Sequence, residues 1–197
     1  MRVVAVPVKS LSRAKTRLSP ALTGLERGAL TLAMLEDVLD AALSVPGWES
    51  WVARPIPEAK PPLANAIRQV EAKAKQDGAT ALAVLPADVP LVTADTLHEA
   101  LRTLGAVVLA RSADGSGTSL LLRRPPRAIP ARFGPDSFRR HLELAAERGL
   151  PVSVVERREL SFDVDRPDDI LTLLADGRRG RTREVCLQMD LGARLRA

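Results

Sequence analysis

Three aspartates occupy positions where the sequence predicts that extended segments end. Asp88 follows the apolar run at residues 81–85, in a turn stiffened by two prolines. Asp163 and Asp165 are two residues apart on a predicted extended segment, so their side chains share one face. Like charges held side by side are costly unless a cation or water separates them, and carboxylates suit a divalent cation. Alternatively, Asp88 caps a turn and one of the later pair caps a helix.

Basic residues dominate the segment that follows the first predicted strand. Residues 9–20 carry Lys9, Arg13, Lys15 and Arg17 and contain no acidic residue. A lysine ammonium is a compact point charge that can reach a phosphate oxygen, so this segment is a candidate anion-binding loop. A solvated basic loop without a ligand is the alternative interpretation.

Small and hydroxyl-bearing residues gather in two later turns. Residues 111–118 read RSADGSGT and end at Thr118, and their two glycines allow the backbone to close on an anion. Residues 132–138 read RFGPDSF and place Gly134 and Ser137 at the start of a predicted helix, whose free amides can bind phosphate or carboxylate. Ordinary side-chain capping of that helix would give the same pattern.

The elements that must position these residues alternate between strand and helix. Apolar runs predict strands near residues 2–8, 51–53, 80–85, 106–110, 119–123 and 152–155. Capping signals and apolar periodicity predict helices near residues 23–43, 63–76, 93–105 and 136–148, with a short helix from Pro167. The alternation predicts a three-layer α/β domain with a mainly parallel sheet. Because the polar stretches follow or close strands, we expect them to converge on one edge of that sheet.

Composition narrows the class of protein. The 197 residues are 46% apolar and 27% charged, as in soluble globular proteins. The chain has no apolar run of membrane length and no signal-peptide profile, so we expect a cytoplasmic protein without a membrane partner. Cys186 is the single cysteine, which excludes an internal disulfide and a multi-thiolate zinc site.

The positive charge is concentrated at the end of the chain. Of the net charge of +5, residues 176–197 supply +3, from six arginines and three acids. We therefore expect one domain over residues 1–175 and an Arg-rich tail over residues 176–197. The tail is either loosely held or forms an oligomer contact, as in a homodimer. The nearly balanced charge of the remaining body and an aromatic content of 3% argue against a nucleic acid partner.

Five stretches resemble, in this order, the CofC/FbiD family: PVKSLSRAKTRLSP, LPADVPLV, GSGTSLLL, RFGPDSF and FDVDRPDDI. This family comprises the 2-phospho-L-lactate and phosphoenolpyruvate guanylyltransferases of deazaflavin coenzyme biosynthesis, which belong to the Rossmann-like nucleotidyltransferases. The similarity covers about residues 3–174. It implies a Rossmann-like fold and a Mg²⁺-dependent transfer of a guanylyl group from GTP, or another NTP, to a small phosphorylated carboxylic acid, with release of pyrophosphate.

The resemblance also implies roles for individual residues. The implied nucleotide-binding residues belong to the basic loop and to the PLANAI segment: Lys9, Lys15, Arg17 and Asn65. The implied metal ligands are the three aspartates Asp88, Asp163 and Asp165. The residues implied to hold the phosphate and carboxylate of the acceptor are Thr118, Gly134 and Ser137. Of all these, Lys15 and Asp88 are implied to be catalytic.

The implied chemistry requires no histidine. The acceptor phosphate is already an anion at neutral pH, so the enzyme must supply charge neutralisation and alignment at the α-phosphate. His98 and His141 fall inside predicted helices, and we expect both to be structural. Two alternatives stay open, a catalytically impaired nucleotide-binding or assembly module and a guanylyltransferase of the molybdopterin type.

Overall fold

The computed structural model describes residues 1–8, 15–56 and 59–196. The strands and helices follow the order β1 (Arg2–Pro7), η2 (Thr16–Leu18), α1 (Gly24–Leu43), β2 (Glu49–Ala53), α2 (Pro62–Gln76), β3 (Ala81–Val84), α3 (Ala94–Arg102), β4 (Val107–Arg111), β5 (Thr118–Arg123), α4 (Ser137–Ala146), β6 (Val152–Val154), α5 (Arg158–Ser161), α6 (Pro167–Asp176), α7 (Arg181–Gln188) and α8 (Leu191–Arg194). Each strand and helix predicted from the sequence is present, with ends that differ by a few residues.

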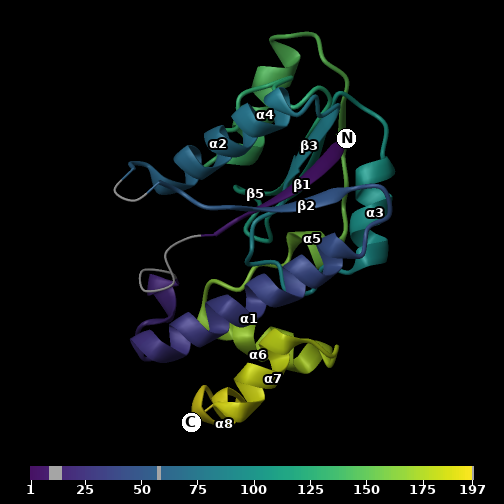
Figure 1. Ribbon diagram of the computed structural model, residues 1–197. Helices are drawn as coiled ribbons and strands as arrows, with labels where there is room; N and C mark the ends of the chain where they lie inside the picture. Colours follow the sequence, from purple (N-terminus) through teal and green to yellow (C-terminus); the bar gives the residue numbers. More distant parts are fainter. Residues whose placement is uncertain (9–14, 57–58, 197) are drawn as a thin grey trace.

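The strands form one sheet in the order β2-β1-β3-β5-β4-β6. β1 pairs in parallel with β2 and β3, and β4 pairs in parallel with β6. β5 runs antiparallel between β3 and β4. Helices α2 and α4 cover one face of the sheet, and α1, α3 and α5 cover the other (Figure 1). The three-layer architecture and the mainly parallel sheet are thus confirmed.

The Arg-rich end of the chain is not a loosely held tail. It forms α7 and α8, which pack with α6 on the side of α1 away from the sheet (Figure 1). Cys186 and Leu191 are fully buried there. The Asp37 carboxylate of α1 accepts hydrogen bonds from the backbone N–H groups of Arg181 and Thr182, at 2.6 and 2.8 Å. The first turn of α7 is therefore capped by a residue distant in sequence, which local sequence signals do not reveal.

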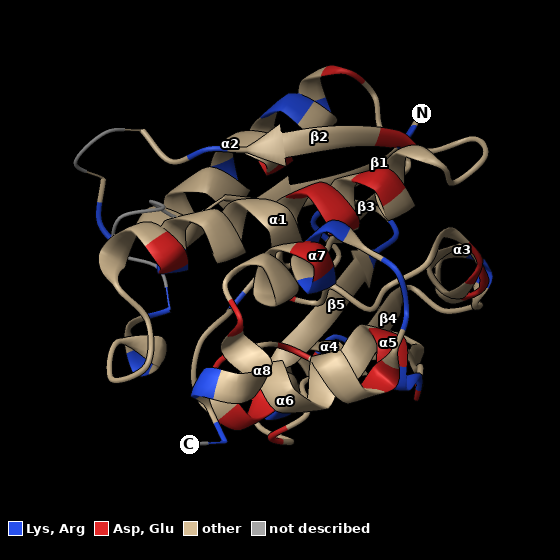
Figure 2. Ribbon diagram, turned by 90° about the horizontal axis from the view of Figure 1, so that it is seen from below, with Lys and Arg blue, Asp and Glu red and all other residues tan. Residues whose placement is uncertain are grey.

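The arginines of this segment are balanced by nearby acids. Arg194 lies 2.6 Å from Glu26, and Arg178 lies 2.8 Å from Glu159. Figure 2 shows acidic and basic residues side by side over α7 and α8 rather than gathered on one basic face. The net positive charge of the C-terminal segment is therefore largely compensated where it lies.

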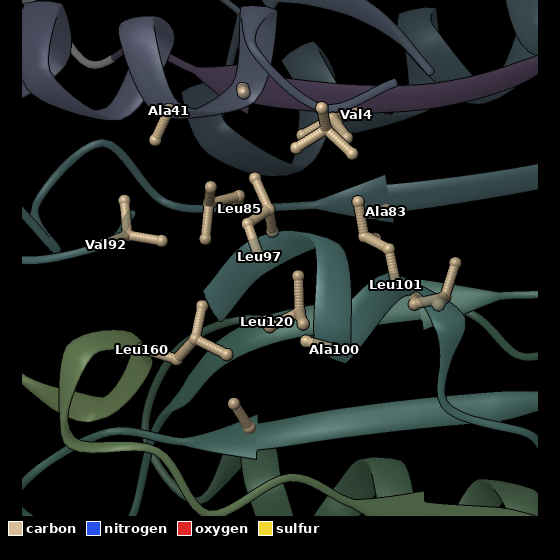
Figure 3. Close-up of a cluster of buried hydrophobic side chains, with 14 of the residues drawn as sticks. Val4, Ala41, Ala83, Leu85, Val92, Leu97, Ala100, Leu101, Leu120 and Leu160 are labelled. Carbon is tan, nitrogen blue, oxygen red and sulfur yellow. The ribbon is translucent and has the colours of Figure 1, made fainter. Parts of the chain in front are cut away.

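The main apolar core fills the space between the sheet and the layer of α1, α3 and α5. Figure 3 shows side chains from these elements pointing toward one another, among them Val4, Ala41, Ala83, Leu97, Leu101, Leu120 and Leu160. Leu85 and Val89 belong to the same cluster and are fully buried. They anchor both sides of the turn that carries Asp88, which gives that carboxylate a rigid support.

Among the described residues, no helix combines the length and apolar character needed to cross a membrane.

Candidate active site

A cavity of about 450 Å³ lies at the edge of the sheet where β1, β3 and β4 end. Its lining comes from the segments after those strands, from the start of α4 and from residues 163–165. Thr31, Met34 and Leu35 of α1 add a partly apolar wall. The polar stretches that we expected to converge on one edge do line this single space.

Lys15 joins two of the three aspartates in this cavity. Its Nζ lies 2.8 Å from Asp88 Oδ2 and 2.8 Å from Asp165 Oδ1, and its side chain is only 7% exposed. Burial opposes the charged form, but the attraction of Asp88 and Asp165 outweighs it and raises the pKa of Lys15 above its ordinary value. Arg17 adds a second cation, with Nη1 3.2 Å from Asp165 Oδ2.

The segment that carries Asp163 and Asp165 is held by alternating side chains. Phe162 and Val164 are buried in a second apolar cluster, so the aspartates between and after them face the other way, toward the cavity. The Val164 N–H donates to the Asp88 backbone carbonyl at 3.1 Å, which ties the two acidic segments together. Asp169 is the residue that caps α6, because its carboxylate accepts from the N–H groups of Asp165 and Arg166.

The Asp163 carboxyl group is partly buried and lies near other negative charges. Burial is the largest cause of its raised pKa, and repulsion from Asp88 and Asp165 raises the pKa further, while Lys15 lowers it. The resulting pKa of Asp163 is about 6. Within the part of the chain that the structure describes, no three His, Cys, Asp or Glu side chains form a ready-made metal-binding group. The available donors are nevertheless all carboxylate oxygens, and a divalent cation would relieve this repulsion. The three aspartates therefore fit a divalent cation in charge and ligand chemistry.

Hydroxyl groups line the same cavity at the start of β5 and of α4. Thr118 is 6% exposed, and its Oγ1 lies 3.0 Å from His141 Nδ1. Ser137 is 1% exposed, and its Oγ has no hydrogen-bond partner among the described residues. Asp136 occupies the N-cap position of α4 without a side-chain cap. Gly134 has φ +128°, a conformation that favours glycine, and open space surrounds its Cα where a side chain would project.

The turn between β4 and β5 is shaped by its own side chains. Ser112 and Ser116 donate to the Asp114 carboxylate, and these hydrogen bonds lower the pKa of Asp114 to about 2. The Gly117 N–H donates to Ser112 Oγ at 2.7 Å, and a Cβ at Gly117 would lie 2.5 Å from that oxygen. A side chain at Gly117 would therefore displace the Ser112 hydroxyl from this hydrogen bond, and the turn as it stands presents Thr118 at a defined place in the cavity wall.

Most of the predicted site residues meet at this cavity. Those that line it are Lys15, Arg17, Asp88, Thr118, Gly134, Ser137, Asp163 and Asp165. Asn65 is not among the residues found to line it; its Oδ1 accepts from the Ile56 N–H and from Gln69 Nε2. Lys9 lies outside the described residues. The roles predicted for all these side chains stay predictions.

Two residues beside the cavity were not identified from the sequence as part of a site. Asp114 organises the turn before Thr118, and its position between two serines was the available signal. His141 was expected to be structural, but it contacts Thr118, which is 23 positions earlier in the chain. A contact between β5 and the middle of α4 has no local sequence signal.

Residues 1–195 match the family model described as "Guanylyl transferase CofC like". The phosphoenolpyruvate guanylyltransferase of Rubrobacter xylanophilus is 38% identical over 190 residues, which cover 87% of this chain and 93% of that protein. The 2-phospho-L-lactate guanylyltransferase of Haloarcula marismortui is 35% identical over 179 residues, covering 87% and 84%. The solved structure of a nucleotidyl transferase from Methanothermobacter thermautotrophicus shares the fold, with a TM-score of 0.57 at 17% identity and coverage of 89% of this chain and 97% of that one.

Proposed function

The chain belongs to the CofC-like guanylyl transferases, and from this premise we propose that it transfers a guanylyl group from GTP to a small phosphorylated carboxylic acid. Its reaction class is nucleotidyl transfer, as in the relatives described above. We propose Mg²⁺ as the cofactor, pyrophosphate as the second product, and phosphoenolpyruvate or 2-phospho-L-lactate as the class of acceptor. The proposed place of the reaction is deazaflavin coenzyme biosynthesis.

The observation that carries this proposal is the position of Lys15 between Asp88 and Asp165, 2.8 Å from each, in the cavity that Thr118 and Ser137 also line. Carboxylates beside a buried ammonium suit a metal-bound triphosphate. Buried hydroxyls in the same cavity suit a smaller oxyanion. Both reactants of a guanylyl transfer would thus find complementary groups in one space.

The reaction can be assigned to these residues as follows. Asp88, Asp163 and Asp165 would hold Mg²⁺, which when bound neutralises charge on phosphate oxygens. An anionic oxygen of the acceptor phosphate forms a bond to the α-phosphorus of GTP while the bond to the bridging oxygen of pyrophosphate breaks. Lys15 and Arg17 would compensate the charge that develops on the departing pyrophosphate. No proton has to leave the acceptor, which agrees with a cavity lined by cations, acids and hydroxyls.

A pyrophosphate-release assay tests this function. The protein is incubated with Mg²⁺ and each NTP in turn, with phosphoenolpyruvate, 2-phospholactate or 3-phosphoglycerate as acceptor. We expect release with GTP and a three-carbon acid, and a loss on the order of 100-fold or more in Asp88→Asn. Asp95→Asn, an exposed acid of α3, is the matched control and keeps full activity.

Three outcomes would contradict the proposal. Absence of pyrophosphate release with every combination would exclude the transferase reaction with these acceptors. Tight binding of GTP without turnover would instead favour a nucleotide-binding module. Equal activity of Asp88→Asn and Asp95→Asn would show that Asp88 has no part in the chemistry.

A further inference from the structure

His141 makes two hydrogen bonds inside the protein, one through each ring nitrogen. Its side chain is fully buried in the middle of α4. Nε2 accepts a hydrogen bond from the Arg132 backbone N–H at 2.9 Å. Nδ1 lies 3.0 Å from Thr118 Oγ1, at the start of β5. The imidazole therefore links the segment before α4 to the cavity wall.

The first of these bonds determines the tautomer of the ring. A backbone N–H can only donate, so Nε2 must offer its lone pair to Arg132. Burial, together with the positive charge of Arg123, lowers the pKa of His141 to about 4, so the ring is neutral at physiological pH. A neutral imidazole carries one proton, which must then reside on Nδ1.

The tautomer in turn determines the direction of the hydrogen bond at Thr118. With a proton on Nδ1, the His141 ring donates and Thr118 Oγ1 accepts. The hydroxyl proton of Thr118 must therefore be donated elsewhere, and the described residues offer no acceptor for it in hydrogen-bond range. Thr118 lines the cavity, so the remaining direction for this donor is the cavity itself.

Ser137 gives an independent indication that a ligand accepts hydrogen bonds here. It lies one helical turn before His141, is 1% exposed and also lines the cavity. Its Oγ has no hydrogen-bond partner in the part of the chain that the structure describes. A buried hydroxyl whose proton has no acceptor is costly, so the hydroxyls of Thr118 and Ser137 in one wall indicate a site that is completed by a ligand.

We propose that His141 is a positioning residue that holds Thr118 as a hydrogen-bond donor toward an anionic oxygen of the acceptor acid. The inference rests on the proposed function, because that acid is one of its two substrates. A hydroxyl restricted to donation favours an oxygen that only accepts, as in an ionised phosphate or carboxylate, over a neutral hydroxyl group. His141 would thus contribute to selection of the acceptor without touching it.

A double-mutant cycle tests whether His141 acts through Thr118. His141→Gln should raise the KM for the acceptor about tenfold, as expected for one lost hydrogen bond, and leave the KM for GTP unchanged. Thr118→Val should have an effect of similar size, and the double variant should be no worse than Thr118→Val alone. His98→Gln, on α3, is the matched control and should change neither KM. Effects that multiply, or that fall equally on both substrates, would overturn the proposal.

An NMR measurement on the unmodified protein gives a test that does not require turnover. The chain has two histidines, so His98→Gln assigns the ring signals in long-range ¹H–¹⁵N spectra. We expect His141 to show the Nδ1–H tautomer between about pH 6 and pH 8, and its Nδ1–H signal to shift when phosphoenolpyruvate is added.

The two proposals can fail separately. A protein that releases no pyrophosphate but shows this tautomer and this shift would retain the positioning role and lose the proposed reaction. An Nε2–H tautomer, a charged ring, or no response to phosphoenolpyruvate in an active enzyme would overturn the role of His141, even if His141→Gln does not fold.

Discussion

The Asp163 carboxyl group binds a proton more readily in the folded protein than in the unfolded chain. Its pKa rises from 3.8 to about 6, mainly through burial and then through repulsion from Asp88. For a group whose pKa is raised by folding, the stabilisation is complete below the unfolded pKa and is lost as pH rises through the folded pKa. In the absence of metal, the ionised Asp163 carboxylate therefore lowers the free energy of unfolding at neutral pH. This is the pH range in which the aspartates must be ionised to hold a cation.

The first prediction is that ionisation of Asp163 destabilises the metal-free protein. With EDTA present, raising the pH from about 4 to about 7 should reduce the free energy of unfolding of the unsubstituted protein relative to Asp163→Asn. The reduction should be less than the roughly 3 kcal/mol of the full pKa shift, because solvent screens this partly exposed group. The amide has the same shape and does not titrate, so the difference between the two proteins isolates this group. Urea denaturation at a series of pH values measures it. Asp95→Asn should follow the unsubstituted protein, and parallel profiles for all three would contradict the assignment.

At the level of single residues, the sequence predicted the position of several side chains but not their direct contacts. The spacing of Asp163 and Asp165 and the strand before Asp88 were visible in the sequence, and the structure does bring these acids to one cavity. Lys15 was expected at the same edge of the sheet, but its direct ion pairs with Asp88 and Asp165, which lie 73 and 150 positions away, were not predicted. Such contacts depend on which strands become neighbours in the sheet, and apolar periodicity carries no such information.

At the scale of elements, α7 depends on a carboxylate supplied by α1. Its N-cap residue is Gly180, which has no side chain, and the Asp37 carboxylate takes over by accepting from the N–H groups of Arg181 and Thr182 and from the Thr182 hydroxyl. The second prediction is that Asp37→Ala lowers the free energy of unfolding by about 1–2 kcal/mol, as for the loss of an N-cap. The exposed Asp40 on the same helix provides the matched control Asp40→Ala, with little change expected.

The reactivity of Cys186 shows whether the loss of stability in Asp37→Ala is confined to α7. It is the single cysteine of the chain, it is fully buried, and burial raises the pKa of its thiol to about 11. Asp37→Ala should increase its rate of reaction with a disulfide reagent about tenfold, because α7 then opens more often. Unchanged labelling in a destabilised Asp37→Ala protein would show that the cap does not hold α7 in place.

The elements that were predicted from the sequence are stabilised by local interactions, whereas those that were missed depend on tertiary packing. β1 and β3 are continuous apolar runs, and α1 begins at a capping box formed by Thr23 and Glu26, so local signals identified them. α7 and α8 lack side-chain caps of their own and carry many arginines, so the same signals indicated a loose tail. Their order comes from packing on α1, which is a tertiary effect.

At the scale of the whole molecule, the second apolar cluster connects the C-terminal helices to the candidate active site. Cys186 of α7 and Leu191 of α8 belong to the same cluster as Phe162 and Val164, which flank Asp163. Met34 of α1 belongs to it as well and also lines the cavity. The C-terminal helices therefore support the acidic segment from behind, although their own residues are not found in the cavity lining.

The last prediction is that removal of residues 181–197 abolishes activity without unfolding the main core. The deletion removes Cys186 and Leu191 from the apolar cluster that also holds Phe162 and Val164. Each large apolar side chain that loses burial costs about 1.5–3 kcal/mol, so the acidic segment should lose its fixed position. Trp48 is 8% exposed and belongs to the main cluster, so its fluorescence should stay native while pyrophosphate release disappears. Leu187→Ala, at an exposed position of α7, is the control and should remain active. A truncated protein with full activity would show that α7 and α8 are dispensable for the site, and loss of the native Trp48 signal would show that the two cores unfold as one.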